Sequence, residues 1–379
     1  MRGGECDLWH LHAVVSSSQP HSRTKGVKTG VLLLNVGTPD STAVADVRRY
    51  LREFLSDRRV LDMPAPVRWL FLNLVILPTR PRRSAEAYRK VWTPQGSPLL
   101  VHSRALREAV AGALGDGHAV ELAMRYGNPS IADALTRLRV ARVDRIVLFP
   151  LFPQYSAAAT GSALARVFEL MAGSWDIPHV ITIPPFFDHP GFIRAVAARA
   201  RPVLALAAPD HVLFSYHGLP ERQLRRSDPT GRHCFATEHC CDTLGSPNRN
   251  CYRAQTHVTS RALARELALE PTPWSVSFQS RLGRTPWIVP HTDRELPRLA
   301  ARGIKRLAVL CPSFTSDCLE TIEEIGIRAK DQWRELGGSE LTLVPCVNAQ
   351  PDWVETVAKM VRAAVTPDIS ASETETPSR

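Results

Sequence analysis

The stretch GVLLLNVGTPDSTAVADVRRYLREFLSD, residues 30–57, carries the pattern that decides the fold class. It begins with a short, continuous run of branched apolar side chains, which is typical of a strand that is buried on both faces. A Ser/Asp start signal then opens a segment with helical spacing, whose apolar side chains on one face are Val44, Val47, Leu51, Phe54 and Leu55. A buried strand followed by an amphipathic helix is the unit from which parallel sheets covered by helices are built.

The same unit recurs along the chain. Seven more short apolar runs resemble buried strands: VELAMRYG from Val120, RIVLFPLFP from Arg145, HVITIPPF from His179, HVLFSYHG from His211, WSVSFQS from Trp274, RLAVLCP from Arg306 and LTLVPCVN from Leu341. Segments with helical spacing separate most of them, which predicts parallel sheets with helices on both faces. The length of 379 residues favours two four-stranded halves over one eight-stranded sheet. The predicted fold class is therefore α/β, with two parallel four-stranded sheets flanked by helices.

Composition and spacing divide the chain into four parts. Residues 1–27 are predicted to be a disordered N-terminal extension and residues 366–379 a disordered tail. Residues 28–152 form the first predicted half. Residues 153–365 form the second, with an internal cysteine segment at 227–255 and a C-terminal helix, because the Pro/Ala/Ser-rich stretch FPQYSAAATGS marks a break.

Charge and composition limit the classes of function. A net charge of +10 attracts anionic partners, but no zinc-finger spacing or RNA-binding signature accompanies it, so no nucleic-acid partner is predicted. No G-x-G-x-x-G follows the first strand, which weakens the case for a dinucleotide. The chain has no run of about 18 apolar residues and no secretory leader. We therefore expect it in the cytoplasm, a reducing compartment.

Charged and polar side chains follow several of the predicted strands. Ligands of doubly wound sheets bind beyond the carboxyl ends of the strands, so these positions carry the most weight. The strand from residue 211 ends in SYHGLP, which places His217 at its tip. The strand from residue 306 leads into a predicted helix with Asp317, Glu320 and Glu324, whose spacings of three and four put them on one face. Acidic residues in a first turn also complement the helix dipole, but with an imidazole nearby they would form a proton-accepting cleft that attracts cations.

The segments at these strand ends resemble the signature segments of ferrochelatase, the terminal enzyme of haem synthesis. They are FSYHGLP, SFQSRLG, TPWIVPHTD and CPSFTSDCLETIEEIG. The resemblance extends in the family's order from GVLLLNVGTPDS through KVWTPQGSPLL, MRYGNP and FPQYSAAATGS to CVNAQPDWVE, which covers residues 30–365. It implies two Rossmann-like, chelatase-type halves that enclose a cleft. The implied activity is insertion of ferrous iron, as substrate, into protoporphyrin IX with release of two protons.

The resemblance also implies roles for individual residues. His217 matches the histidine that takes the pyrrole protons or passes the metal, and Glu320 matches the facing carboxylate. Asp317 and Glu324 would continue an acidic track for protons or iron. Cys318 stands where eukaryotic relatives carry a histidine, so a second obligatory histidine is not implied. The residues that match cleft residues near the macrocycle are Arg125, Tyr126, Tyr155 and Trp287.

The segment PVRWLFLNLVILPTRPRR, residues 66–83, is apolar for about three turns and is bordered by arginines. It is too short to span a bilayer. Its pattern alone favours a core helix, whereas the resemblance makes it the apolar lip through which the porphyrin enters, in peripheral contact with the inner membrane face. Arg80, Arg82 and Arg83 would then meet anionic headgroups, at about 1 kcal/mol each.

The segment SDPTGRHCFATEHCCDTLGSPNRNCYRAQ, residues 227–255, holds four of the eight cysteines. The spacing C-x5-C-C-x9-C matches neither the plant-type ferredoxin pattern nor a zinc ribbon, and by itself leaves an iron-sulfur cluster and a structural zinc open. Some bacterial ferrochelatases carry cluster ligands inside the second half of the chain. This resemblance favours a 2Fe-2S cluster, whose ligands would be Cys234, Cys240, Cys241 and Cys251.

Two other functions stay open at the level of sequence. The first is another tetrapyrrole chelatase, such as one that inserts iron into coproporphyrin. The sequence does not show which side chains would bind the peripheral carboxylates of the tetrapyrrole. The second is a non-catalytic iron-sulfur protein that senses tetrapyrrole or iron. The presence of His217 together with Glu320 favours the enzyme over the sensor.

Overall fold

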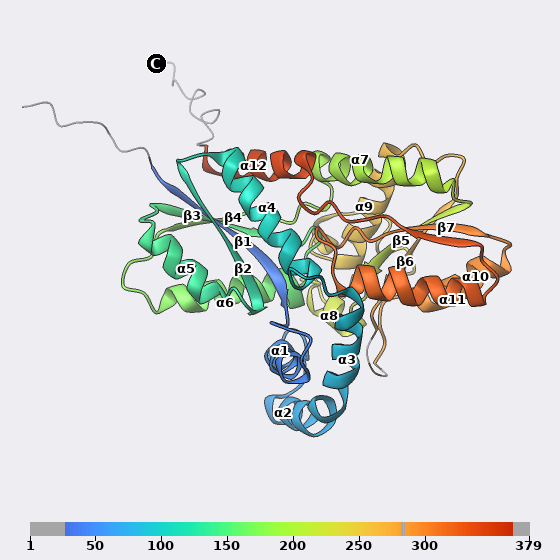
Figure 1. Ribbon diagram of the computed structural model, residues 1–379, viewed down its shortest axis with the longest axis horizontal. Coiled ribbons are helices and arrows are strands. Elements are labelled where there is room, and N and C mark those ends of the chain that lie inside the picture. The colour runs from blue at the N-terminus through green and yellow to red at the C-terminus, as the bar shows by residue number, and fades with distance from the viewer. Residues whose placement is uncertain (1–26, 282, 284, 367–379) are drawn as a thin grey trace, which may run out of the picture.

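The computed structural model describes residues 27–281, 283 and 285–366. Two parallel four-stranded sheets lie side by side (Figure 1), in the orders β2-β1-β3-β4 and β6-β5-β7-β8. The eight strands are β1 (Thr29–Thr38), β2 (His118–Gly127), β3 (Arg145–Pro150), β4 (His179–Thr182), β5 (His211–His217), β6 (Trp274–Gln279), β7 (Arg306–Leu310) and β8 (Glu340–Leu343). The predicted α/β class and the two four-stranded halves are confirmed. The terminal segments predicted to be disordered lie outside the described residues, apart from Val27 and Thr366.

The first sheet is apolar on both faces because β1 alternates between two cores. Val31 and Leu33 belong to one core, with side chains of α4 (Pro98–Leu114). Leu32 and Leu34 belong to another, with side chains of α5 (Ile131–Val140) and α6 (Ser162–Ala172). This continuous burial explains why the strand is a run of apolar residues rather than an alternation.

The second sheet repeats this construction. On one face, Phe214 and Tyr216 of β5 pack with α9 (Tyr252–Glu266). On the other face, Leu213 packs with α10 (Thr292–Ala301) and with Trp333 of α11 (Lys330–Glu335). Outside the helical lobe described below, the other helical segments are a π-helical segment (Ala157–Gly161), α7 (Pro190–Ala207), α8 (Glu221–Arg226), a 3-10 turn (Ser246–Asn248), a second π-helical segment (Glu320–Ala329) and α12 (Pro351–Val365).

The division of the chain differs from the predicted one. Strand β4 pairs with β3, so the first sheet continues past residue 152 to Thr182. The C-terminal helix α12 packs against α4 of the first half as well as against α7, along the upper edge of the molecule in Figure 1. The Pro/Ala/Ser-rich stretch after β3 is not a linker, because its Gln154 and Ser156 are buried and line a cavity.

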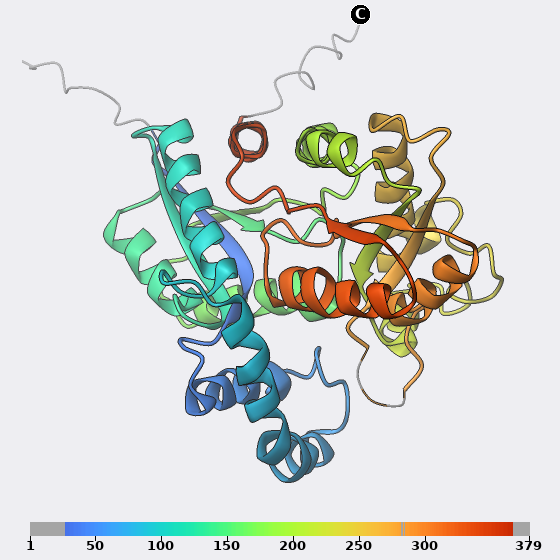
Figure 2. The ribbon, with the colours of Figure 1, turned by 45° about the vertical axis from the view of Figure 1, so that its right-hand side comes forward.

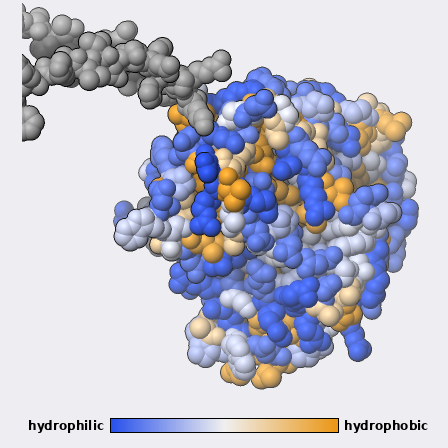
Figure 3. Space-filling model, turned by 60° about the vertical axis from the view of Figure 1, so that its left-hand side comes forward, coloured by the Kyte–Doolittle hydropathy of each residue, from blue (hydrophilic) through white to orange (hydrophobic). Residues whose placement is uncertain are grey.

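The segment 66–83 forms part of a helical lobe that projects beyond the first sheet (Figure 2). The lobe consists of α1 (Val44–Ser56), α2 (Ala65–Phe71), a π-helical segment (Leu72–Ile76) and α3 (Leu77–Val91). Leu72, Ile76 and Leu77 are buried against α1, as a core helix would be. The opposite face is exposed (Figure 3), and its apolar side chains, which we call the apolar lip, are Val67, Trp69, Leu70, Phe71, Leu74 and Val75. No helix in the described part of the chain is long and apolar enough to cross a membrane.

Candidate active site

A cavity of about 1070 Å³, open solvent at its mouth included, lies where strands of both sheets end. Its wall is built by the end of β1, the segments after β3, β5 and β7, and side chains of α1, α3 and α9. Such a position beyond the carboxyl ends of parallel strands is the usual ligand site of doubly wound sheets. The apolar side chains that line it include Val36, Phe54, Leu99, Leu151, Phe152, Leu219, Phe314 and Leu319. A volume and lining of this kind suit a large, flat, apolar ligand.

His217 lines this cavity from the tip of β5. Its Nδ1 lies 2.6 Å from the carbonyl oxygen of Gly218, and its backbone N–H donates to Ser313. A carbonyl oxygen can only accept, so Nδ1 carries the proton of the neutral ring. The other ring nitrogen, Nε2, is then the one with a free lone pair. His217 therefore offers the cavity a base of defined tautomer.

Glu320 lines the same cavity and is the first residue of the π-helical segment. Gln279 of β6 donates to its backbone carbonyl at 2.8 Å, which fixes the start of the helix. Two buried phenols lie near the carboxylate. Burial, followed by the Glu320 charge, raises the pKa of Tyr88 above its usual value, and burial likewise raises that of Tyr50, so both hydroxyls stay neutral. Burial and the neighbouring Glu320 also raise the pKa of Cys318, so this thiol stays protonated.

Asp317 and Glu324 do not line the cavity with Glu320. Asp317 precedes the helix, so the expectation that the three carboxylates share one helical face is wrong. Its buried carboxylate accepts from Asn348 at 2.7 Å and from the backbone N–H of Cys346 at 3.1 Å. Glu324 accepts from the backbone N–H and the hydroxyl of Ser280, which follows β6. Both carboxylates therefore anchor the segment on which Glu320 is carried.

Arg125 and Tyr126 lie behind the cavity wall rather than on it. Arg125 Nη2 is 2.8 Å from the carboxylate of Asp57, and the Tyr126 hydroxyl donates to the same carboxylate at 3.0 Å. The Tyr126 ring is fully buried and meets Phe54, a lining residue, edge to face at 5.0 Å. Burial acts to raise the pKa of Asp57, but hydrogen bonds from Ser162 and Arg59 N–H, together with the Arg125 charge, hold it below its usual value. This buried network supports the wall formed by α1.

Tyr155 and Trp287 also lie beside the cavity rather than among its lining residues. The neighbours of Tyr155 on both sides line the wall, and its own backbone N–H donates to the side chain of Gln255 at 2.6 Å. Trp287 forms an isolated antiparallel β-bridge with Pro220. Its ring lies 3.2 Å from the position that a Cβ atom on Gly218 would occupy. Trp287 therefore packs next to the residue that orients the His217 ring.

Several lining residues were not predicted, among them Asn35, Tyr50, Tyr88, Ser97, Gln154 and Tyr252. Asn35 had a signal in the sequence, because it is a polar residue inside the apolar run of β1 and donates to Ser103. Gly37, two residues later, has φ +115°, and a Cβ there would stand 1.9 Å from the Tyr126 carbonyl oxygen. Glycine therefore allows the end of β1 to approach β2.

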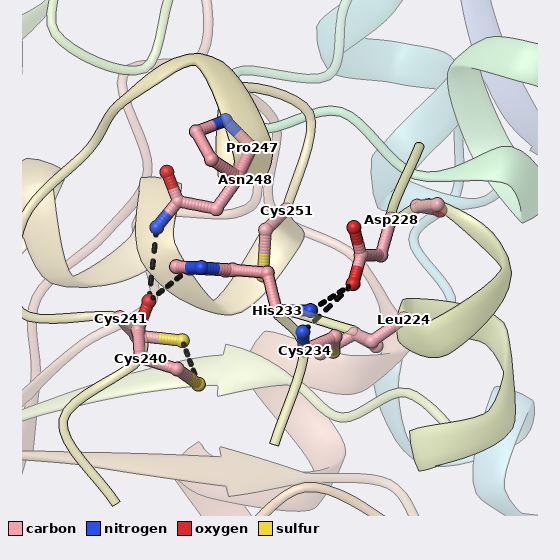
Figure 4. A pocket seen from close by; sticks show the side chains of 10 residues that line it. Leu224, Asp228, His233, Cys234, Cys240, Cys241, Pro247, Asn248 and Cys251 are labelled. Atoms are coloured by element: carbon pink, nitrogen blue, oxygen red, sulfur yellow. Dashed lines mark hydrogen bonds between the residues drawn. The ribbon is translucent and has the colours of Figure 1, made fainter. Parts of the chain in front are cut away.

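The four clustered cysteines line a second, smaller cavity of about 230 Å³, open solvent included (Figure 4). Cys240, Cys241 and Cys251 are buried and Cys234 is half-buried, and the Sγ atoms of Cys240 and Cys241 are 3.7 Å apart. Hydrogen bonds from Cys234 and Cys241 lower the pKa of Cys251 to about 3. The pKa values of Cys234 and Cys241 rise, first because of their bonds to Cys251 and then because of burial.

The loop around these cysteines is shaped by one carboxylate. Asp228 accepts from the backbone N–H groups of His233 and Cys234 at 2.7 and 2.8 Å. All seven cysteines in the described part of the chain are free thiols. Among the described residues, no group of three or more His, Cys, Asp or Glu side chains is arranged to hold a single metal ion.

Comparison with known proteins identifies the family. The family model described as Ferrochelatase matches residues 28–365. The chain belongs to the ferrochelatase family. A ferrochelatase of Coxiella burnetii (strain CbuK_Q154) is 49% identical over 338 residues, which cover 89% of this chain and 94% of that protein. One of Azotobacter vinelandii is 47% identical over 333 residues, covering 88% and 98%, and one of Legionella pneumophila (strain Corby) is 45% identical over 339 residues, covering 89% and 100%.

The fold comparison agrees with this family. The structure of SirB from Bacillus subtilis with Fe3+ aligns with a TM-score of 0.50 at 11% identity, over 89% of this chain and 96% of that one. This similarity agrees with a fold of two Rossmann-like halves. The family model and the curated relatives confirm the predicted family and the prediction of an enzyme that inserts metal. The sensor without catalysis is the less supported alternative.

Proposed function

We propose that the protein inserts ferrous iron into protoporphyrin IX in the cavity between its two halves. The observation that carries this proposal is that His217 and Glu320, from different strand ends of the second half, line the same cavity, to which the first half also contributes. Insertion of Fe²⁺ into a neutral porphyrin releases two pyrrole protons, so two basic groups at the cavity satisfy its proton balance. Positioned side chains at such a site can accept these protons directly.

In this proposal each of the two bases has its own role. His217 accepts a pyrrole proton at Nε2, because Nδ1 is held by the Gly218 carbonyl oxygen. The Glu320 carboxylate accepts the other proton or attracts the incoming cation, with the neutral hydroxyls of Tyr50 and Tyr88 beside it. Asp317 then acts indirectly, since it holds the turn before Glu320.

The remaining predicted residues act as supports of the cavity wall. Arg125 and Tyr126 fix the wall at α1, Tyr155 fixes the loop after β3, and Trp287 packs beside Gly218. Glu324 ties the helix of Glu320 to the residue after β6. Each of them thus shapes the cavity from behind.

The lining favours protoporphyrin over coproporphyrin. Of the described residues that line the cavity, none is lysine or arginine, and apolar side chains predominate. Coproporphyrin has four peripheral carboxylates, whereas protoporphyrin has two and replaces the others with apolar vinyl groups. Burial of a carboxylate without a cation is costly, so the substrate with fewer carboxylates fits better.

An anaerobic assay of ferrous iron with each porphyrin tests this proposal. We expect metalation of protoporphyrin IX at a kcat/KM at least tenfold above that for coproporphyrin III, the factor that one poorly compensated buried carboxylate would produce. Faster metalation of coproporphyrin would reverse the substrate assignment. Binding of both porphyrins without metalation of either would contradict the proposed activity at this site.

We also propose that Cys234, Cys240, Cys241 and Cys251 hold a 2Fe-2S cluster. The support is that all four thiols line one small cavity, in which Cys234 and Cys241 are hydrogen-bonded to Cys251. A two-iron cluster divides four thiolates between two irons, whereas one zinc needs all four within about 2.3 Å of a single point.

Metal and sulfide analysis of the anaerobically purified protein tests the cluster. Two irons and two sulfides per chain, with the visible absorption of an iron-sulfur centre, are expected. One zinc and no sulfide would contradict the proposal.

The free thiols of the described chain also suit a reducing compartment. We therefore propose a cytoplasmic protein whose apolar lip contacts the inner membrane face.

A further inference from the structure

Helix α9 lies between the two cavities and contributes to both. Cys251, the residue before its first turn, lines the cysteine cavity. Tyr252, its first residue, lines the porphyrin cavity. Two consecutive residues at the start of one helix therefore face two different sites.

The buried face of α9 is polar, which is unusual for a core helix. Gln255, which is 1% exposed, uses both ends of its side-chain amide. Its nitrogen donates to the carbonyl oxygen of Arg249, in the cysteine segment, at 2.6 Å. Its oxygen accepts from the backbone N–H of Tyr155, in the wall of the porphyrin cavity, at 2.6 Å. One buried side chain thus joins the two regions directly.

A second bond from the same helix supports this connection. Thr259, one turn further along α9, accepts from Gln154 Nε2 at 3.0 Å. Gln154 lines the porphyrin cavity next to Tyr155. The loop after β3 is therefore held to α9 at two successive residues.

We propose that Gln255 is a positioning residue that couples the four cysteines to the wall of the porphyrin cavity through α9. A change in the cysteine segment moves the Arg249 carbonyl, loosens the Gln255 amide and thereby frees the Tyr155 N–H and the loop around it. This inference rests on the proposed porphyrin site. Coupling of this kind is reciprocal, so porphyrin in the cavity also stabilises the cysteine segment.

Amide exchange at residue 155 measures the coupling without relying on activity. Gln255→Met keeps the length of the side chain but removes both bonds, and should speed this exchange about tenfold, since one buried bond contributes about 1 kcal/mol and its loss leaves an unpaired N–H. Cys251→Ala should speed it by a similar factor. Thr256→Val is the matched control, because Thr256 is fully buried on the same helix and its hydroxyl, among the described residues, donates to the carbonyl oxygen of Arg253 alone. Exchange at residue 155 should therefore not change.

A double-mutant cycle then decides the proposal. The variant with both Gln255→Met and Cys251→Ala should exchange no faster than either single variant, because both remove the same connection. Effects that multiply, or no effect of Cys251→Ala at residue 155, would overturn it. If Cys251→Ala does not fold, Cys234→Ala at the half-buried cysteine replaces it under the same criteria.

Porphyrin affinity separates this inference from the proposed function. Fluorescence quenching should show protoporphyrin IX bound about fivefold more weakly by Gln255→Met and by Cys251→Ala, and unchanged by Thr256→Val. A wild-type protein that binds no porphyrin would refute the proposed function, while the exchange experiment would still decide the coupling. If the wild type binds porphyrin and all the variants bind it equally well, the coupling alone is refuted.

Discussion

Replacement of Arg125 by Leu tests whether this residue supports the wall or touches the porphyrin. The side chains of Arg125 and Asp57 are 16% and 6% exposed, and their ion pair is 2.8 Å long. Removal of the cation leaves a buried carboxylate that keeps its bonds to Tyr126 and Ser162 but loses its counter-charge. Breaking a buried pair in this way costs about 3 kcal/mol, at the lower end of the usual range because these bonds remain.

Urea unfolding followed by circular dichroism, with porphyrin titration on the same samples, is the assay. We expect the midpoint of Arg125→Leu to fall clearly, with porphyrin affinity reduced by less than about threefold, because the residue lies behind the wall. Arg137→Leu is the control, since its pair with Glu121 is more exposed and should change stability by less than about 1 kcal/mol. An unchanged midpoint together with a tenfold loss of porphyrin affinity would refute the wall-support role and place Arg125 against the macrocycle.

The same network predicts a dependence of stability on pH. The pKa of Asp57 in the folded protein lies below its ordinary value of 3.8, despite the opposing effect of burial. A group whose folded pKa is depressed stabilises the fold fully above its unfolded pKa, and this contribution is lost as the pH falls through the folded value. The destabilisation by Arg125→Leu should therefore be largest near neutral pH and shrink below about pH 4. A stability difference between the two proteins that grows toward low pH would contradict this assignment.

Three further predictions concern the site, the lip and the cluster. His217→Ala should abolish metal insertion and leave porphyrin affinity within about threefold, and Glu320→Gln should lower kcat at least about tenfold, both measured anaerobically with ferrous iron; full activity of either variant would remove that residue from the mechanism. Leu70→Ser with Leu74→Ser, at positions 48% and 67% exposed, should reduce flotation with anionic vesicles and leave the melting temperature unchanged, whereas a large fall in that temperature would mean that the lip belongs to the core. Cys251→Ser should remove the visible chromophore, because a cluster with four thiolate ligands has no spare one, while the same change at buried Cys346 should leave it intact.

The sequence by itself predicted where the strands lie and that His217 stands at the tip of β5. Each strand is a short apolar run between polar segments, a local pattern that follows from burial on both faces. His217 was predictable as a cavity residue because a parallel strand presents its carboxyl end to the ligand, whatever its neighbours are. The ordered segments of the family's pattern indicated the activity, and those that carry His217 and Glu320 follow the ends of β5 and β7.

The tertiary structure decided which of these residues meet. Asp317 and Glu320 are three residues apart, yet Asn348 holds one carboxylate in the core while the other lines the cavity, because the helix begins between them. Spacing along the chain could not show this, since it assumes a regular helix. The segment 66–83 is likewise both core and surface, because α1 covers only one of its faces. Gln255 connects Arg249 with Tyr155 only because two distant segments fold against the same helix, and such a contact has no local signal in sequence.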